Sequence, residues 1–263
     1  MQVIIAGLIL AGLGLIFGLG LAFASKIFFP KLDKKLEMIL ELLPGANCGA
    51  CGKAGCLGFA EAVLNGELDI SACRVSSEEA KEKISKILNK EFKRTQKLVA
   101  VLHCNGNNIE DRFIYDGIKT CKHANLVLGG QKSCIWGCLG FGDCVKVCPF
   151  GAISIKDKLP KVDINKCTGC GKCLEACPKK LFSLIPLNYG FYIACSSHSL
   201  PKDTKTVCSV GCISCGICVK IAPSIFYLDD NLSRIDYKKI KKEDLKLLEE
   251  AKKRCPVECI LKI

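Results

Sequence analysis

Cysteine constrains this chain more than any other residue type. There are 21 cysteines among 263 residues, far above ordinary usage. Thiols at this density form disulfides, bind zinc or hold iron–sulfur clusters, and their spacing decides among the three. Aromatic residues make up only 7% of the chain, so large aromatic cores are scarce, whereas 49% apolar residues exclude a disordered tail.

An apolar segment begins the sequence. Residues 3–24 carry no charge, and as a helix they would be about 33 Å long, enough to cross a bilayer. A cleaved signal peptide is the alternative, because Ala22-Phe23-Ala24 resembles a cleavage site. No Lys or Arg precedes the run, which favours an uncleaved anchor. Lysines follow from Lys26 onward, so we expect a single-pass protein of the inner (cytoplasmic) membrane with its cysteines on the cytoplasmic side.

The first cysteine group lies in a glycine-rich loop. Its pattern is Cys48-x2-Cys51-x4-Cys56, followed by Cys73. The cytoplasm is reducing, so disulfides are disfavoured. Zinc is the structural alternative, but it usually takes two separated Cys-x2-Cys pairs. Three thiols on one small loop, with glycines that permit tight curvature, favour a [4Fe–4S] cluster.

The strongest signal lies in the middle of the chain. The run Cys167-x2-Cys170-x2-Cys173-x3-Cys177-Pro178 is the bacterial ferredoxin pattern, in which the fourth Cys binds the other cluster of a pair. An expanded version precedes it, Cys134-x3-Cys138-x5-Cys144-x3-Cys148-Pro149. The crossed assignment predicts two [4Fe–4S] sites: Cys167, Cys170, Cys173 with Cys148, and Cys134, Cys138, Cys144 with Cys177.

A third module follows with one predicted cluster. It begins with Cys212-x2-Cys215-x2-Cys218, but Ala222 stands where a fourth thiol is expected. The fourth ligand is therefore assigned to the distant Cys255-Pro256. This is the layout of a one-cluster ferredoxin.

An internal repeat relates the last two modules. A shift of 74 residues places Cys121, Cys134, Cys138 and Cys144 on Cys195, Cys208, Cys212 and Cys218. Phe141 falls on Cys215, so Cys134 is interpreted as the substitute for the ligand that Phe141 cannot supply. Five cysteines remain, either as buried structural thiols or as part of an additional or alternative metal site: Cys104, Cys121, Cys195, Cys208 and Cys259. The nearby His103, His123 and His198 are interpreted as surface or packing residues.

No catalytic residue is predicted. The chain has no dinucleotide fingerprint, Walker loop, Ser/His/Asp set or H-E-x-x-H motif, so we expect neither flavin nor NAD here. The formal charge of +12 falls to about +4 once four clusters, each about −2, are counted. This argues against nucleic-acid binding. The charged run from Lys238 to Arg254 mixes Lys with Glu and Asp, so it is interpreted either as a solvated helix face or as a docking surface for an acidic electron carrier. A zinc-rich nucleic-acid-binding module is the alternative.

The pattern predicts a small, loop-rich α+β fold. The expected domains are a transmembrane anchor (1–29), a four-cysteine [4Fe–4S] domain (30–92), a two-cluster ferredoxin-like domain (93–190) and a one-cluster ferredoxin-like domain (191–263). Helices are expected at 31–43, 61–64, 77–91 and 239–254. Strands are expected at 98–103, 182–185 and 191–194, with a hairpin turn at 229–231.

Two stretches resemble a known family. They are the Leu43-Pro44-Gly45-Ala46-Asn47-Cys48 segment with its following cysteines, and the Gly129-Gly130 to Cys144 segment. Together with the apolar segment, they resemble the RnfB family of the Rnf membrane complex. The resemblance implies an electron-relay subunit of a ferredoxin:NAD oxidoreductase that couples electron flow to Na⁺ or H⁺ translocation. It implies other subunits as partners and reduced soluble ferredoxin as the donor. A stand-alone membrane-tethered polyferredoxin is the alternative.

Overall fold

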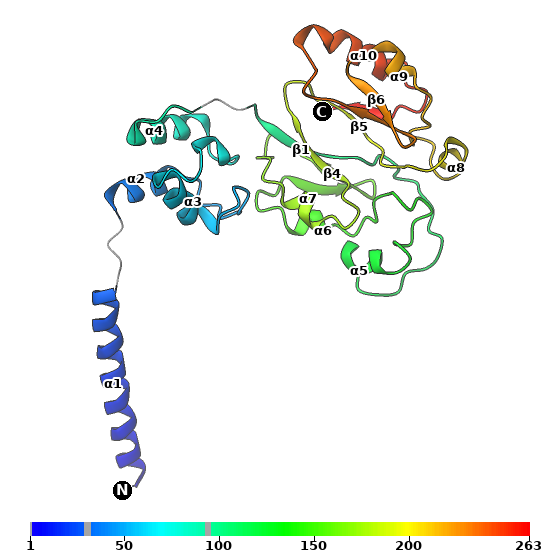
Figure 1. Cartoon of the computed structure of the whole chain (residues 1–263). Helices are drawn as coiled ribbons and strands as arrows, with labels where there is room; N and C mark the ends of the chain where they lie inside the picture. Colours follow the sequence, from blue (N-terminus) through cyan, green and yellow to red (C-terminus); the bar gives the residue numbers. More distant parts are fainter. Residues whose placement is uncertain (1, 29–32, 93–95) are drawn as a thin grey trace.

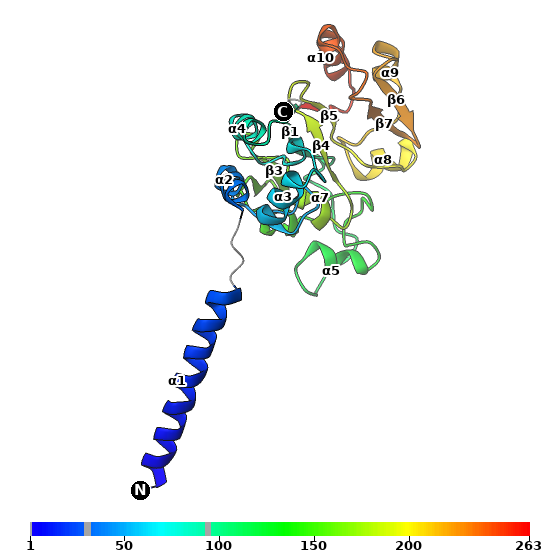
Figure 2. The same ribbon diagram turned by 60° about the vertical axis from the view of Figure 1, so that its left-hand side comes forward.

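A computed structural model describes residues 2–28, 33–92 and 96–263. It begins with the long helix α1 (Gln2–Phe28), which stands clear of the other elements (Figures 1 and 2). Within the described residues this is the one helix long and apolar enough to cross a membrane, over Ile4–Lys26. Its described side chains are almost all exposed.

A small helical unit follows (Figure 1). It contains α2 (Lys34–Leu42), α3 (Gly55–Leu64), the 3-10 turn η1 (Ile70–Ala72) and α4 (Glu78–Leu88). Its core is formed chiefly by Ile39, Phe59, Val63 and Ile84, all fully or almost fully buried. Ser77 caps α4 by accepting a hydrogen bond from the Ala80 N–H. The predicted start of α2 at residue 31 lies outside the described residues.

The helix expected at 61–64 is longer than predicted. It begins at Gly55, because the side chain of Asn47 bends back and its Oδ1 accepts a hydrogen bond from the Cys56 N–H at 2.8 Å. This bond satisfies a free N–H at the helix start that would otherwise need a local cap. The cysteine loop therefore runs directly into a helix.

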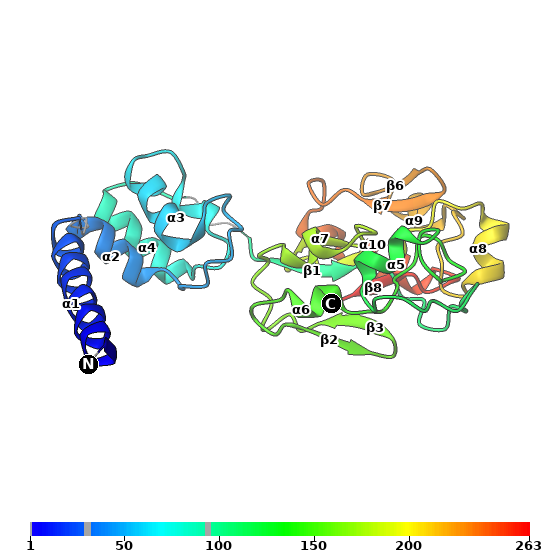
Figure 3. The ribbon, with the colours of Figure 1, turned by 90° about the horizontal axis from the view of Figure 1, so that it is seen from below.

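The middle of the chain folds around two antiparallel strand pairs. Strand β1 (Leu98–Leu102) pairs with β4 (Phe182–Pro186), so that Leu98 lies opposite Pro186. Strands β2 (Ile153–Lys156) and β3 (Leu159–Val162) form a hairpin. Short helices lie beside them: α5 (Cys121–Leu126), α6 (Asp143–Lys146) and α7 (Lys172–Ala176). Figure 3 shows the helical unit to one side of β1 and these elements to the other.

The last third repeats this plan. Strand β5 (Phe191–Ile193) pairs with β8 (Ile260–Lys262), and β6 (Phe226–Asp229) forms a hairpin with β7 (Leu232–Ile235). Asp230 and Asn231 have positive φ in the predicted turn between them. The helical elements are α8 (Pro201–Val207), α9 (Ile217–Ile221), the 3-10 turn η2 (Lys242–Asp244) and α10 (Leu245–Lys253).

The helix predicted over 239–254 is shorter in the structure. Regular α-helix begins only at Leu245. The preceding segment is tied elsewhere, because the Tyr237 hydroxyl donates to the Phe191 carbonyl oxygen at 2.7 Å and the Ile240 side chain is buried in the C-terminal core. Charge pattern alone did not reveal these tertiary contacts.

His103 joins the last two parts of the chain. Its Nδ1 contacts the Ile193 carbonyl oxygen of β5 at 2.6 Å, and its Nε2 contacts Ser183 Oγ of β4 at 2.6 Å. Since a carbonyl oxygen only accepts, Nδ1 must carry the proton. Burial lowers the pKa of His103, so the neutral ring is favoured. The boundary expected near residue 190 thus lies beside a hydrogen-bonded junction and remains a prediction.

Candidate iron–sulfur sites

The cysteines gather around five small cavities. Four cavities are lined by four cysteines each, and the fifth by five. All 21 thiols are free. We name the cavities N-terminal, distal central, proximal central, junction and C-terminal, and define each by its cysteines below.

The N-terminal cavity is lined by Cys48, Cys51, Cys56 and Cys73, the set predicted from spacing. Asn47 holds the loop against the start of α3 through its bond to Cys56. A Cβ added at Gly55 would lie 2.7 Å from Asn47 Oδ1, so glycine is required for this approach. The local backbone thereby turns three thiols toward one space.

The distal central cavity is lined by Cys148, Cys167, Cys170 and Cys173. The structure therefore brings together the crossed set predicted from the ferredoxin run. Two backbone amides point at its sulfurs: Ala152 N–H donates to Cys148 Sγ at 3.3 Å, and Ala100 N–H donates to Cys167 Sγ at 3.4 Å. Burial raises the pKa of the Cys173 thiol to about 12, so ligation of a metal there must displace a proton.

The proximal central cavity differs from the sequence assignment. Cys138, Cys144 and Cys177 line it as predicted, but the fourth cysteine is Cys121, not Cys134. Cys121 is the first residue of α5, which the Thr120 side chain caps. The carboxylate of Asp143 accepts a hydrogen bond from the Lys122 N–H at 2.9 Å, tying α5 to the start of α6. Tertiary contact, rather than sequence proximity, brings the fourth thiol here.

Cys134 instead lines the junction cavity with Cys104, Cys195 and Cys208. Sequence reasoning left these last three unassigned. One signal pointed to Cys208 alone: the 74-residue shift pairs Cys134 with Cys208, and it also pairs Cys121 with Cys195. The second pair does not share a cavity, because Cys121 lies with Cys138 while Cys195 lies at the junction.

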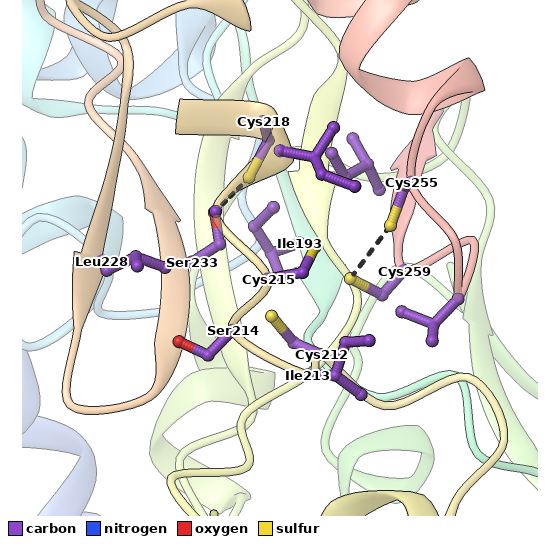
Figure 4. Close-up of a pocket in the computed structure, with 14 residues that line it drawn as sticks. Ile193, Cys212, Ile213, Ser214, Cys215, Cys218, Leu228, Ser233, Cys255 and Cys259 are labelled. Atoms are coloured by element: carbon purple, nitrogen blue, oxygen red, sulfur yellow. Dashed lines mark hydrogen bonds between the residues drawn. The ribbon is translucent and has the colours of Figure 1, made fainter. Parts of the chain in front are cut away.

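The C-terminal cavity holds the predicted Cys212, Cys215, Cys218 and Cys255 together with Cys259 (Figure 4). The sulfurs of Cys255 and Cys259 are 3.8 Å apart. A hydrogen bond from the Cys259 thiol lowers the pKa of Cys255 to about 5, whereas Cys259 itself is held protonated by its hydrogen bonds to Cys212 and Cys255. Cys218 Sγ lies 3.1 Å from the buried Ser233 hydroxyl.

The three histidines lie outside these thiol sets or are engaged elsewhere. His103 lines the junction cavity, but both of its ring nitrogens are hydrogen-bonded. His123 contacts its own helix cap, Thr120. His198 contacts Asp230 and Arg234. Among the residues that line these cavities, thiols rather than imidazoles are therefore the candidate donors.

This donor chemistry fits iron–sulfur clusters. Among residues 2–28, 33–92 and 96–263, no three His, Cys, Asp or Glu side chains converge closely enough to hold a single metal ion. Zinc draws its four sulfurs to about 2.3 Å from one point, whereas a four-iron cluster takes four thiolates spaced around a larger body. Four thiols around a cavity, with amides directed at their sulfurs, match the second arrangement.

Comparison with known proteins agrees with this chemistry. Three family models match the chain: a putative Fe–S cluster domain over residues 43–75, a 4Fe–4S dicluster domain over 133–181, and a 4Fe–4S single cluster domain of ferredoxin I over 209–261. Together they cover four of the five cysteine groups in whole or in large part.

Curated relatives are similar over most of the chain. The RnfB-type component of the ion-translocating oxidoreductase complex of Methanosarcina acetivorans is 38% identical over 88% of this chain and 89% of its own length. The corresponding component of the Na(+)-translocating ferredoxin:NAD(+) oxidoreductase complex of Acetobacterium woodii is 39% identical over 96% and 75%, respectively. The counterpart from the proton-translocating complex of Clostridium ljungdahlii is 39% identical over 76% and 72%. This chain therefore belongs to the RnfB family of ion-translocating oxidoreductase complexes.

Proposed function

We propose that this chain is the iron–sulfur electron-relay subunit of an Rnf-type complex that couples ferredoxin:NAD oxidoreduction to Na⁺ or H⁺ translocation. The observation that carries the proposal is the series of four-thiol cavities along a chain whose relatives are subunits of such complexes. The chain has no dinucleotide fingerprint, so the hydride chemistry is assigned to other subunits.

Four [4Fe–4S] clusters are proposed for the cavities that the family models touch. A bound cluster supplies reversible one-electron redox chemistry. The thiols that would hold them form these sets: Cys48, Cys51, Cys56, Cys73; Cys148, Cys167, Cys170, Cys173; Cys121, Cys138, Cys144, Cys177; and Cys212, Cys215, Cys218, Cys255. Cys121 replaces Cys134 in the third set, since Cys121 lines that cavity.

The polypeptide would set the reduction potentials of these clusters through backbone hydrogen bonds to the sulfurs and through burial. The same contact follows both central Cys-Pro pairs. Ala152 N–H donates to Cys148 Sγ and Leu181 N–H donates to Cys177 Sγ, and in both cases the donor lies four residues after the cysteine. Cys255 precedes Pro256 just as Cys148 and Cys177 precede their prolines. This shared pattern supports Cys255, rather than Cys259, as the fourth ligand of the C-terminal set.

Electron arrival is proposed at the C-terminal cavity. Cys215 is the one exposed cysteine of the 21, so its sulfur offers the shortest path from a docked donor. The proposed donor is reduced soluble ferredoxin, a class of acidic carrier. Four exposed lysines near the start of α10 offer it a basic surface: Lys238, Lys239, Lys241 and Lys242. The proposed membrane anchor is α1, with the cysteine-bearing part on the cytoplasmic side.

Stopped-flow reduction of the purified chain by reduced ferredoxin, across a salt series, tests this function. We expect the rate to fall steeply as ionic strength rises, and charge reversal of the four lysines to slow reduction about tenfold or more at low salt. The matched control reverses four exposed lysines on or just beyond the β2–β3 hairpin, Lys156, Lys158, Lys161 and Lys166, and leaves the rate unchanged. Direct reduction by NADH without a flavoprotein would contradict the proposal. So would equal slowing by both sets.

A further inference from the structure

We propose that the junction cavity is a fifth [4Fe–4S] site, with Cys104, Cys134, Cys195 and Cys208 as its ligands. Three of these four cysteines lie outside every stretch that a family model matches, since those stretches are 43–75, 133–181 and 209–261. The site draws on both halves of the internal repeat.

The cavity has the same kind of lining as the other cluster sites. Four thiols from four separate segments face it, as four or five thiols face each of the other cavities. Most of the remaining lining residues are small or apolar, and His103 has both ring nitrogens hydrogen-bonded. Isolated structural thiols have no reason to converge from four segments, whereas a four-iron cluster requires four thiolates around one centre.

The four thiols form two equivalent pairs. Cys104 lies two residues after β1, and Cys195 lies two residues after β5. Each sulfur is hydrogen-bonded by the backbone N–H of a cysteine in the adjacent cavity: Cys138 N–H donates to Cys104 Sγ at 3.5 Å, and the Cys212 N–H donates to Cys195. Cys138 and Cys212 are themselves repeat equivalents.

The second pair is equivalent in finer detail. Cys134 and Cys208 are 74 residues apart, and so are Gly137 and Gly211. A Cβ added at Gly137 would lie 3.3 Å from Cys134 Cβ and 3.5 Å from its Sγ. At Gly211 the corresponding distances to Cys208 are 3.4 and 3.6 Å. Both repeats therefore deliver a thiol to this cavity by the same Cys-x2-Gly turn.

The junction cavity lies between the central cavities and the C-terminal cavity, so a cluster there would be an intermediate site of electron transfer. This role rests on the proposed function. Cys104 adjoins Cys138 of the proximal central cavity, and Cys195 adjoins Cys212 of the C-terminal cavity. On the other side, α6 and α7 pack against each other between the two central cavities. A Cβ added at Gly49, which lines the N-terminal cavity, would lie 3.9 Å from the Nζ of Lys172, which lines the distal central cavity. The cavities thus follow one another from the N-terminal unit to the C-terminal module. Electron tunnelling falls off exponentially with distance, so the junction site closes the gap between the central pair and the C-terminal site.

Metal and sulfide analysis of the full-length protein, purified anaerobically in detergent, tests the site. We expect about 20 iron atoms and about 20 sulfides per chain, with no stoichiometric zinc. Cys208→Ala distinguishes this assignment from the one based on spacing alone, in which Cys208 is not a cluster ligand. It should either lose about four iron atoms or convert one cluster to a three-iron form with its own EPR signal in the oxidised state.

Cys195→Ala should behave in the same way as Cys208→Ala. The matched control is Val210→Ala, which changes a side chain lining the same cavity without removing a thiol and should keep the full iron count. If Cys208→Ala does not fold, the iron content of Cys208→Ser, compared with that of the wild-type chain, decides whether the fifth site exists. A wild-type count near 16 iron, unchanged in Cys208→Ala, would overturn the fifth site while leaving the relay function intact, as would about one zinc at the junction. A chain without iron would overturn both.

Discussion

Close approach of the backbone to the cluster loops depends on single glycines. Gly169 lies between Cys167 and Cys170 with φ +68°, and a Cβ added there would lie 2.5 Å from the Leu98 carbonyl oxygen of β1. That oxygen belongs to the backbone of a paired strand and cannot move away cheaply. Gly171 has a similar φ of +84°, but nothing lies within 4 Å of its added Cβ. Both glycines have a positive φ, but only Gly169 would also collide with β1. Comparing the two positions therefore separates the cost of the backbone conformation from the cost of the collision.

Gly171→Ala should destabilise the fold by about 1 kcal/mol, the usual cost of a left-handed conformation for a residue with a Cβ. Gly169→Ala adds the collision with β1 and should cost on the order of 3 kcal/mol. The measurement is the temperature at which the visible absorbance of the clusters is lost. Equal temperatures for the two variants would show that β1 does not press on this loop.

Cys259 gives the C-terminal site a spare thiol. Its sulfur is 3.8 Å from Cys255 Sγ within the same cavity. We therefore expect Cys255→Ala to keep most of its iron by recruiting Cys259, with a changed EPR spectrum. Cys259→Ala should leave the iron content unchanged, and the double variant should lose about four iron atoms. Iron analysis and EPR check this. Loss of the cluster from Cys255→Ala alone would show that Cys259 cannot reach it.

At the scale of elements, the sequence pattern correctly predicted the segments whose conformation depends mainly on residues close together in the chain. The strands containing Leu98, Phe182 and Phe191, and the hairpin turn at Asp230, lie where expected. The compact run around Cys170 also gathered around one cavity, because its thiols share one turn and a helix start. The helix expected from residue 239 was shortened, since Tyr237 bonds across to β5.

Spacing could not place thiols that strand pairing brings together. Cys104 and Cys195 reach the junction cavity because β1 and β5 end beside it, and no motif surrounds either residue. Cys121 reaches Cys138 through the contact between α5 and α6. Cys134 was assigned to the cavity of its sequence neighbours, but its turn directs it to the junction. The internal repeat indicated only that Cys134 and Cys208 occupy equivalent positions.

At the scale of the whole molecule, the cysteine-bearing part is packed independently of α1. The buried cores all lie within residues 36–260, and the described side chains of α1 make no contribution to them. Gly14 and Gly18 have nothing within 4 Å of an added Cβ. If α1 is the membrane anchor proposed above, the spacing of these glycines would let another membrane helix approach closely.

Deleting residues 1–29 should therefore give a water-soluble protein with unchanged iron and sulfide per chain, since no cluster ligand or core residue is removed. Membrane fractionation and metal analysis check this. The matched variant Gly14→Leu/Gly18→Leu keeps the apolar span and should stay in the membrane fraction. If α1 packs against another subunit, this variant should lose co-purification with the membrane partners. Retention of the truncated chain by membranes would instead mean that contacts made by the cysteine-bearing part suffice for assembly, and α1 would then serve only to raise the local concentration of the protein at the membrane.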